Sequence, residues 1–513
     1  MTPDEYRAEF AAFNSSLELE HYLYRAGLEA ELKLAEIEDR YDDLFSLDTI
    51  IDLQSRLEAT ASVFETERAG LHKLLNAARL GHVQLRARVV TKELANCEES
   101  ASVEWKGKGI PLGEIPARLS KEPEKVVRDE LASRWADRVS ICDDLRTARL
   151  DVLHNSSSDT LGFATYRGLI AEATSVNFDQ LQRATNSLLE DTEAVYRSSL
   201  AALAAPELKD LRFEELDWAD YLYFETLPWL ESFFLATNLP KVYSETMNGL
   251  GIRTDKQPNI RIYQIESRSP QSRDWIARCF PISPPDDIRL LVSRQDGVLL
   301  FADFLDEAGQ AQQHAWSSKE LAKRNPEFVY PPDSATTKGY GYLLRYLLLD
   351  PKWILDFIPK VAESRAREIV SQIALVFTAQ ARCLCAELSY GLLLHDAGHR
   401  SLEQLQIAHS DLHFRATFFR ANPRLYLLDL QDQIKSTSQL RALGFAAGLR
   451  EYLRTRHGRR WWASRKAGSE LIDLWNTASR YSVEELARLI GFGEISFELL
   501  ADMLISAMNG EYE

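Results

Sequence analysis

Apolar residues in the first two hundred positions recur at the spacing of helices. One stripe has steps of three and four, as in a helix that buries one face: Leu19, Leu23, Ala26, Ala30, Leu34, Ile37 and Tyr41. Ser15 followed by Glu18 predicts a capping box at its start. Similar stripes cover 57–90 and 181–204, and the segments 107–116 and 155–160 between them predict loops. We therefore predict a helical N-terminal lobe, residues 1–205, without a chemical motif.

The pattern changes after residue 205. Alternating or β-branched apolar residues at 259–265 and 288–293 predict short strands, and the prolines between them predict turns. A helical run at 298–316 follows, then a break at Pro331 and Pro332, then an apolar helix at 337–349. The remaining residues are again helical in pattern. We predict a second domain, residues 206–513, in which a small sheet lies beside the helix at 298–316.

This order of elements carries a resemblance to a known family. Residues 304–312 read F-L-D-E-A-G-Q-A-Q and resemble the zinc helix of the thimet oligopeptidase and oligoendopeptidase family, which reads L-H-E-A-G-H-A. The flanking segments R-C-F-P-I at 278–282 and P-D-D-I-R-L at 285–290 resemble that family's strands. T-K-G-Y-G-Y-L-L at 337–344 is similar to its T-E-G-Y-A-F-L segment. Further similarities lie in order downstream, at 426–442, 457–462 and 471–475. The resemblance implies a mainly α fold, with helical lobes around a channel and a small sheet beside the former zinc helix.

The resemblance also assigns former roles to individual residues. In the family, two histidines one turn apart and a distant glutamate hold zinc, and the glutamate of the motif acts as general base. Asp306 and Gln310 stand at the two histidine positions, and Lys338 stands at the third ligand. Glu307 retains the position of the general base. Lys435 and Gln439 stand where the family carries tyrosines that face the scissile carbonyl.

These replacements remove the chemistry of a zinc peptidase. A protonated lysine cannot bind zinc, and a glutamine oxygen is a poor ligand for it. Without the metal, nothing lowers the pKa of the attacking water from about 15.7 to near 7. Loss of the tyrosines would cost about 10² to 10³ in rate for each oxyanion donor. We expect the Lys338 ammonium to take the place of the metal and to bond to Asp306 or Glu307.

A second group of histidines offers a rival site. His395 and His399 have the H-x-x-x-H spacing, with an acid after the first, and His409 and His413 repeat it. Gly398 and the helix-capping Ser401 predict a turn that points the rings apart. Solvated or capping histidines are therefore the favoured interpretation, and a metal at these four residues is the alternative.

Composition limits the remaining classes of function. The chain has 513 residues, 45% of them hydrophobic, which is enough for a large core. Its net charge of −17 opposes binding to nucleic acid or to an anionic membrane. It has neither an apolar stretch of about 20 residues nor an N-terminal export pattern. Five cysteines favour a reducing compartment, with Cys383 and Cys385 as core thiols and Trp461 and Trp462 as core aromatics. We expect a cytoplasmic protein.

These observations favour a catalytically inactive oligopeptidase homologue without a cofactor. It would bind a peptide or protein segment in the channel or serve as an interaction scaffold; a purely structural scaffold with a closed channel is a further alternative. The alternative is an active metal-dependent oligopeptidase that uses unconventional ligands or zinc at the histidine group. The sequence does not name a ligand or an oligomeric state.

Overall fold

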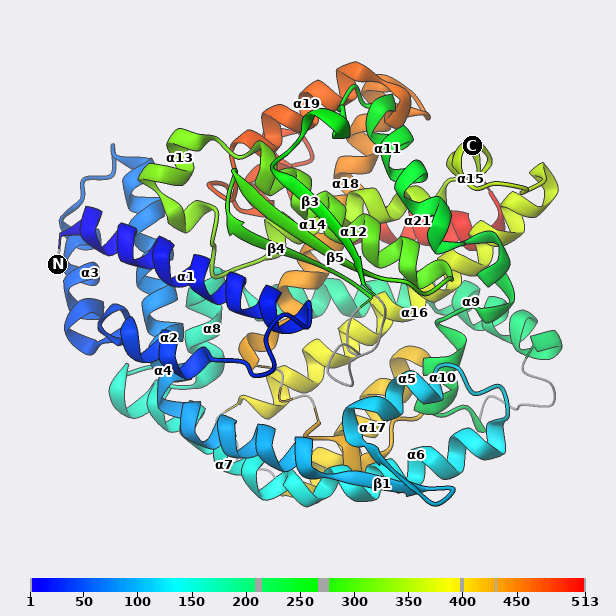
Figure 1. The fold of residues 1–513 in the computed structure, drawn as a ribbon, viewed down its shortest axis with the longest axis horizontal. Coiled ribbons are helices and arrows are strands. Elements are labelled where there is room, and N and C mark those ends of the chain that lie inside the picture. Colours follow the sequence, from blue (N-terminus) through cyan, green and yellow to red (C-terminus); the bar gives the residue numbers. More distant parts are fainter. Residues whose placement is uncertain are drawn as a thin grey trace.

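The computed structural model describes residues 2–207, 215–265, 276–396, 401–428, 430 and 432–511. The fold is mainly helical, as predicted, with a three-stranded sheet near one face (Figure 1). The longer helices before the sheet are α1 (Pro3–Arg25), α3 (Leu47–Ala59), α4 (Glu65–Ser100), α6 (Lys125–Val139), α7 (Asp143–Asn155) and α9 (Phe178–Glu207). Shorter ones are α2 (Leu34–Arg40), α5 (Ile115–Leu119), α8 (Tyr166–Thr174), α10 (Trp218–Phe224) and α11 (Leu239–Gly249).

The N-terminal region corrects three expectations. Helix α1 begins at Pro3, where Thr2 and Glu5 form the capping box, so the box predicted at Ser15 is wrong because Ser15 lies inside a helix already under way. A hairpin of β1 (Ser102–Trp105) and β2 (Lys108–Pro111) replaces part of a predicted loop. Cys97 at the end of α4 forms a disulfide with Cys142 before α7. These two cysteines are therefore not the reduced thiols that the cysteine content led us to expect. The helices α4 and α7 pack together, which brings the two cysteines within reach.

The sheet lies between two helices. Its order is β3 (Ile260–Ile265), β5 (Asp287–Ser293), β4 (Ala277–Ser283), with β3 parallel and β4 antiparallel to β5. Phe280, Ile282 and Leu291 point to one face and pack on Tyr22 of α1. Alternate residues such as Cys279 and Leu290 point to the other face and join the main core with α12 (Val298–Trp316). The strand β4 is therefore an edge strand that lies between α1 and α12 (Figure 1).

Helix α1 is also held by a buried ion pair. Arg7 donates through Nη2 to Glu327 Oε1 at 3.0 Å, and the Glu327 side chain has no exposed surface. Glu327 belongs to the short helix at Pro326–Phe328, which follows α13 (Lys319–Arg324). Arg7, near the start of the chain, is thus bonded to the segment that joins α12 to the helix at Ala335–Arg345.

The helices α12 and α14 (Ala335–Arg345) cross at close range in the core. A Cβ placed on Gly309 would lie 2.8 Å from Gly341 Cα and still closer to the Tyr340 carbonyl oxygen. A Cβ on Gly341 would collide with the Asp306 carboxylate. Only hydrogen at both positions lets the two backbones approach so closely. The crossing sets the separation of every side chain that α12 and α14 direct toward each other.

The remaining helices complete the core. They are α15 (Pro351–Phe357), α16 (Glu363–Leu394), α17 (Leu402–Thr417), α18 (Ser436–His457), α19 (Arg465–Asn476), α20 (Val483–Leu489) and α21 (Phe497–Asn509). Trp461 and Trp462 are each 1% exposed, and Cys383 and Cys385 are buried thiols, which confirms all four as core residues. The main cluster of buried apolar residues includes both Leu80 and Met508, so it crosses the predicted boundary at 205. The two-domain division stays a prediction.

One described helix, α16, is long and apolar enough by composition to cross a membrane. However, 78% of its most apolar window is buried inside the protein, as in the core helix of a soluble protein. The cytoplasmic location stays a prediction.

We expect Gly309→Ala to lower the free energy of unfolding by about 1 to 3 kcal/mol, because the added methyl group would force α12 and α14 apart. Urea unfolding followed by circular dichroism measures this change. Gly113→Ala is the matched control, since a Cβ there meets nothing within 4 Å. Equal stability of the two variants would show that the crossing is not tight.

Candidate functional site

The three residues of α12 that the resemblance assigns to the site form hydrogen bonds within the protein. Gln310 Nε2 donates to Asp306 Oδ1 at 2.9 Å, which links the two former histidine positions along one helical turn. Glu307 Oε2 accepts the backbone N–H of Cys279 in β4 at 2.7 Å. Asp306 and Glu307 are buried, at 7% and 8% exposed. Glu307 therefore accepts a backbone N–H of the edge strand β4, which leaves its carboxylate less free to act on a water molecule.

Lys338 lies on α14 opposite these acids but does not bond to them. Burial alone would lower its pKa, but the nearby charges of Asp306 and Glu307 and the Tyr342 phenol raise it above the usual value. No described residue forms a hydrogen bond or an ion pair within 4.0 Å of its ammonium, so the direct bond that we expected is absent. Instead, Asp306 accepts the amide of Gln310 and Glu307 accepts the backbone N–H of Cys279. Lys338 thus neutralises the acids through space.

More acids surround this pair of helices. Burial raises the pKa of Asp303 to about 6, although the cation of Arg345 opposes the shift. Burial also raises the pKa of Glu225 to about 7, against a hydrogen bond from Gln380. On α1, burial raises the pKa of Glu18 to about 7, against the charge of Arg278. Glu18 and Glu225 could not be predicted as neighbours of α12, because their segments meet it only in the fold.

The former tyrosine positions behave differently from each other. Gln439 on α18 hydrogen-bonds Tyr342, a buried residue one turn after Lys338 on α14. Burial raises the pKa of Tyr342 to about 12, while Lys338 lowers it. Lys435 is exposed at the start of α18 and does not join this group. Tyr342 is thus a hydroxyl that lies beside the former ligands, and the spacing of four after Lys338 was the available signal for it.

Zinc does not fit this set of donors. Lys338 holds its proton tightly, and the Gln310 amide is turned to Asp306. Tetrahedral zinc needs three protein donors of the histidine, cysteine or carboxylate type. In the part of the chain that the structure describes, three such donor atoms lie within 4.8 Å of one another only at Asp129, Asp217 and Asp220. No catalytic step through zinc can be derived at α12.

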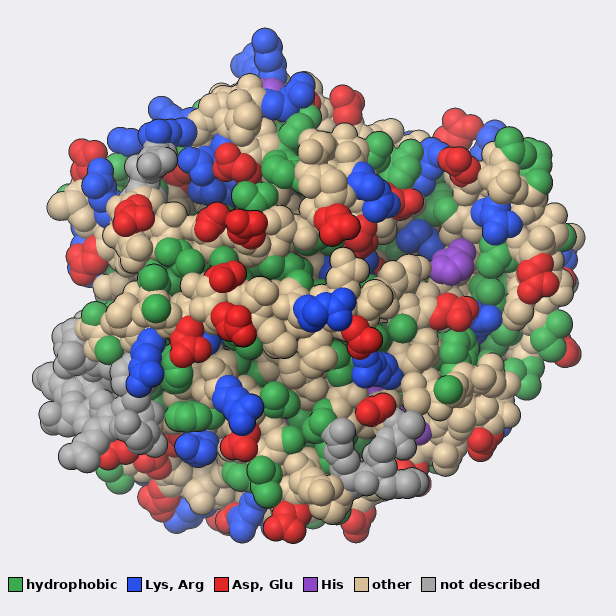
Figure 2. All heavy atoms as spheres, turned by 180° about the vertical axis from the view of Figure 1, so that it is seen from behind, with side chains coloured by type: hydrophobic (Ala, Val, Ile, Leu, Met, Phe, Trp, Pro, Cys, Tyr) green, Lys and Arg blue, Asp and Glu red, His purple; other side chains and the backbone are tan. Residues whose placement is uncertain are grey.

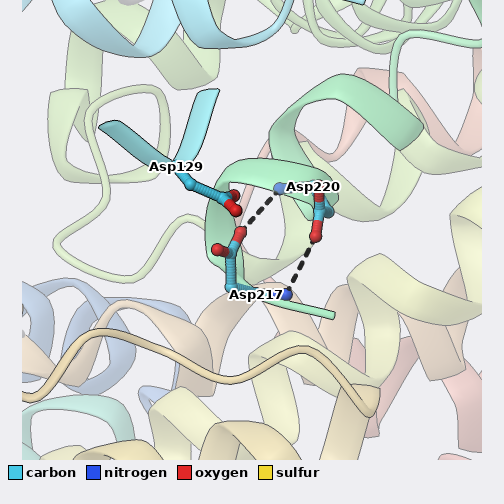
Figure 3. A group of neighbouring side chains, drawn as sticks. All are labelled: Asp129, Asp217 and Asp220. Atoms are coloured by element: carbon cyan, nitrogen blue, oxygen red, sulfur yellow. Dashed lines mark hydrogen bonds between the residues drawn. The ribbon is translucent and has the colours of Figure 1, made fainter. Parts of the chain in front are cut away.

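The group at Asp129, Asp217 and Asp220 already has its counter-ions. Asp217 forms the N-terminal cap of α10, where its carboxylate accepts the backbone N–H of Asp220, while Asp129 approaches from α6 (Figure 3). Lys125 Nζ lies 3.0 Å from Asp129, 3.7 Å from Asp217 and 2.6 Å from Asp220. Arg128 adds a second bond to Asp220, at 2.6 Å. An ammonium thus binds all three carboxylates.

His395 and His413 are buried, at 1% and 5% exposed, and not solvated as we expected, and the described histidines of the rival site fall into separate pairs. His395 ends α16, and its Nδ1 lies 3.0 Å from Nε2 of His154, a partner that sequence spacing did not suggest. His409 and His413 share α17, with ring centroids 4.7 Å apart, and burial lowers the pKa of His409 to about 3 and of His413 to about 4. Ser401 caps α17, as predicted. His399 lies outside the described residues.

A cavity of about 580 Å³ lies between α4, α9, α18 and the segment around α20. Its wall includes His72 and Lys73 of α4, Ala184 of α9, and Arg441 of α18. Figure 2 shows the surface hollowed on the rear face, with basic side chains and a histidine inside the hollow. Arg441 binds Asp333 at 2.7 Å, and Asp333 accepts the N–H of Ala335 at the start of α14. The cavity wall is thus connected to the helix that carries Lys338.

Comparisons with known proteins bear on the fold alone. No family model and no curated protein sequence matches the chain. Among solved structures, it is similar to a protein assigned as oligoendopeptidase F from Bacillus anthracis str. Ames. The TM-score is 0.59 at 12% identity, over 92% of this chain and 81% of that one. This chain has an oligoendopeptidase-like fold. At this identity, the oligoendopeptidase-like fold by itself leaves activity open.

We expect Glu225→Gln to stabilise the protein more at pH 8 than at pH 5, by about 1 to 2 kcal/mol. The folded state raises this pKa above its unfolded value near 4.5, so the stability linked to this proton is lost as pH rises toward about 7. Glutamine keeps the shape and removes the cost of the buried charge. Urea unfolding at the two pH values measures the difference, with the exposed Glu231→Gln as control. The same pH response in both variants would contradict the shift.

Proposed function

We propose that this chain is a non-catalytic relative of the oligopeptidases that binds a peptide or protein segment and does not cleave it by a zinc mechanism. The observation that carries the proposal is the donor set at the former metal site. Asp306 and Gln310 are bonded to each other, Glu307 is bonded to β4, and Lys338 keeps its proton. A site of this kind supplies neither a Lewis acid nor a free general base.

Binding of a peptide is supported by the cavity between α4, α9 and α18. It has a volume of about 580 Å³ and presents both charged and apolar side chains, as Lys73, Arg441 and Glu485 lie with Val176, Leu181 and Phe497. A peptide segment offers the same mixture of backbone dipoles, charges and apolar groups. The resemblance of the sequence to peptidases makes a peptide the natural occupant, and we propose no cofactor.

Protein purified without added metal should contain no stoichiometric zinc, and it should cleave no member of a mixed peptide library in a chelator-sensitive way. Elemental analysis and mass spectrometry of the library measure the two outcomes. Gln310→His alone should restore neither zinc binding nor chelator-sensitive cleavage, because two ligands are still missing. The triple variant Asp306→His, Gln310→His and Lys338→Glu should bind zinc if the resemblance places the site correctly. One equivalent of tightly held zinc in the natural protein would contradict the proposal.

Peptide binding should depend on the cavity wall. We expect Ala184→Trp to weaken the binding of fluorescent peptides selected from a library by about tenfold or more, because the indole ring fills the cavity between α9 and α18. Ala202→Trp, at an exposed position of the same helix, is the control and should bind normally. Fluorescence anisotropy gives both affinities. If both variants bind equally well, the peptide does not enter this cavity.

A further inference from the structure

A groove of about 1230 Å³ lies away from the former zinc helices, between α15, α18 and α21. Helices α15 and α21 lie on the side of the molecule where Figure 1 marks the C-terminus. Leu355 of α15 and Leu499, Met503 and Ile505 of α21 line it, and all four are half-buried. The groove therefore has an apolar wall that keeps contact with solvent.

One arginine in this groove has no partner. Arg450 of α18 is half-buried, and it forms no hydrogen bond or ion pair with any residue in the described ranges. Burial, together with the neighbouring cation of Arg454, lowers the pKa of Arg450 to about 10, so it remains charged at neutral pH. A cation that is partly removed from water without a bonded anion is costly, and an added anion would relieve that cost.

Two acids near Arg450, Asp350 and Glu451, bind other groups. The Asp350 carboxylate accepts the N–H of Lys352 at 2.8 Å and that of Trp353 at 3.4 Å as the cap of α15. Glu451 lies 3.4 Å from Arg454. Because Asp350 stays within electrostatic range of Arg450, a dianion placed beside Arg450 would meet repulsion. The geometry favours a ligand with one negative charge.

We propose that this groove binds a small organic acid, with its carboxylate on the Arg450 guanidinium and its apolar body against Leu499, Met503 and Ile505. A guanidinium matches a carboxylate with two parallel N–H···O bonds, which fixes the orientation of the ligand. The apolar wall gains from covering a hydrocarbon chain. Inorganic phosphate would use only the arginine and would leave the wall uncovered. This site is independent of the proposed peptide binding.

Calorimetric titration of the full chain with octanoate tests the proposal. We expect saturable binding of one octanoate, with the affinity reduced at least tenfold in Arg450→Gln and unchanged in Arg86→Gln. Arg86 is an exposed arginine of α4 outside the groove, so its replacement is matched in charge. Met503→Glu places a negative charge in the apolar part of the groove and should also weaken octanoate binding at least tenfold. This second variant keeps the test valid if Arg450→Gln folds poorly.

Two further ligands separate the contribution of the carboxylate charge from that of the apolar side chains of the groove. Octanamide, which has the same chain without the charge, should bind at least tenfold more weakly than octanoate. Phosphate should not displace octanoate. Absence of saturable octanoate binding, equal affinity in the natural protein and Arg450→Gln, or displacement by phosphate would each overturn the proposal.

Discussion

The contact between Gly309 and Gly341 is the constraint on which the rest of the site depends. It lets α12 and α14 cross with their backbones almost touching, since a single methyl group at either position has no room. Asp306, Glu307 and Lys338 then share one small volume of protein, although 31 positions separate Glu307 from Lys338 in the sequence. Because the protein interior screens charge poorly, these three groups influence one another without touching.

Around this crossing, buried acids are accompanied by cationic side chains of opposite charge. Glu18, Glu225, Asp303 and Glu307 all have a pKa raised by burial, and Arg278, Lys338 and Arg345 supply the opposing charge. A zinc site would need the acid and its neighbours to be free for the metal and a water molecule. Here the carboxylates of α12 accept hydrogen bonds from Gln310 and β4 instead. Asp306 and Glu307 therefore form hydrogen bonds that hold the structure together.

Two arginines of helix α18, Arg441 and Arg450, differ in the partners that surround them. Arg441 bonds to both Asp333 and Glu484, at 2.7 and 2.6 Å, so its charge is satisfied inside the protein. Arg450, less than three turns farther along the helix, faces a groove in which the neighbouring acids cap a helix or bind another arginine. The first arginine stabilises the wall of a cavity, whereas the second remains available to a ligand. Identical side chains on one helix therefore take different roles.

The sequence by itself determined the local elements and their order. Apolar periodicity placed the helix at 298–316 and the strands β3 and β5, and Ser401 marked the start of α17, because these signals act between residues a few positions apart. The ordered motifs also predicted the oligoendopeptidase-like fold. Only the tertiary structure decided the partners. Arg7 binds Glu327 across 320 positions, His154 meets His395 across 241, and Lys338 does not reach the carboxylates that we expected it to bind. Such contacts depend on how distant elements pack, which local pattern does not encode.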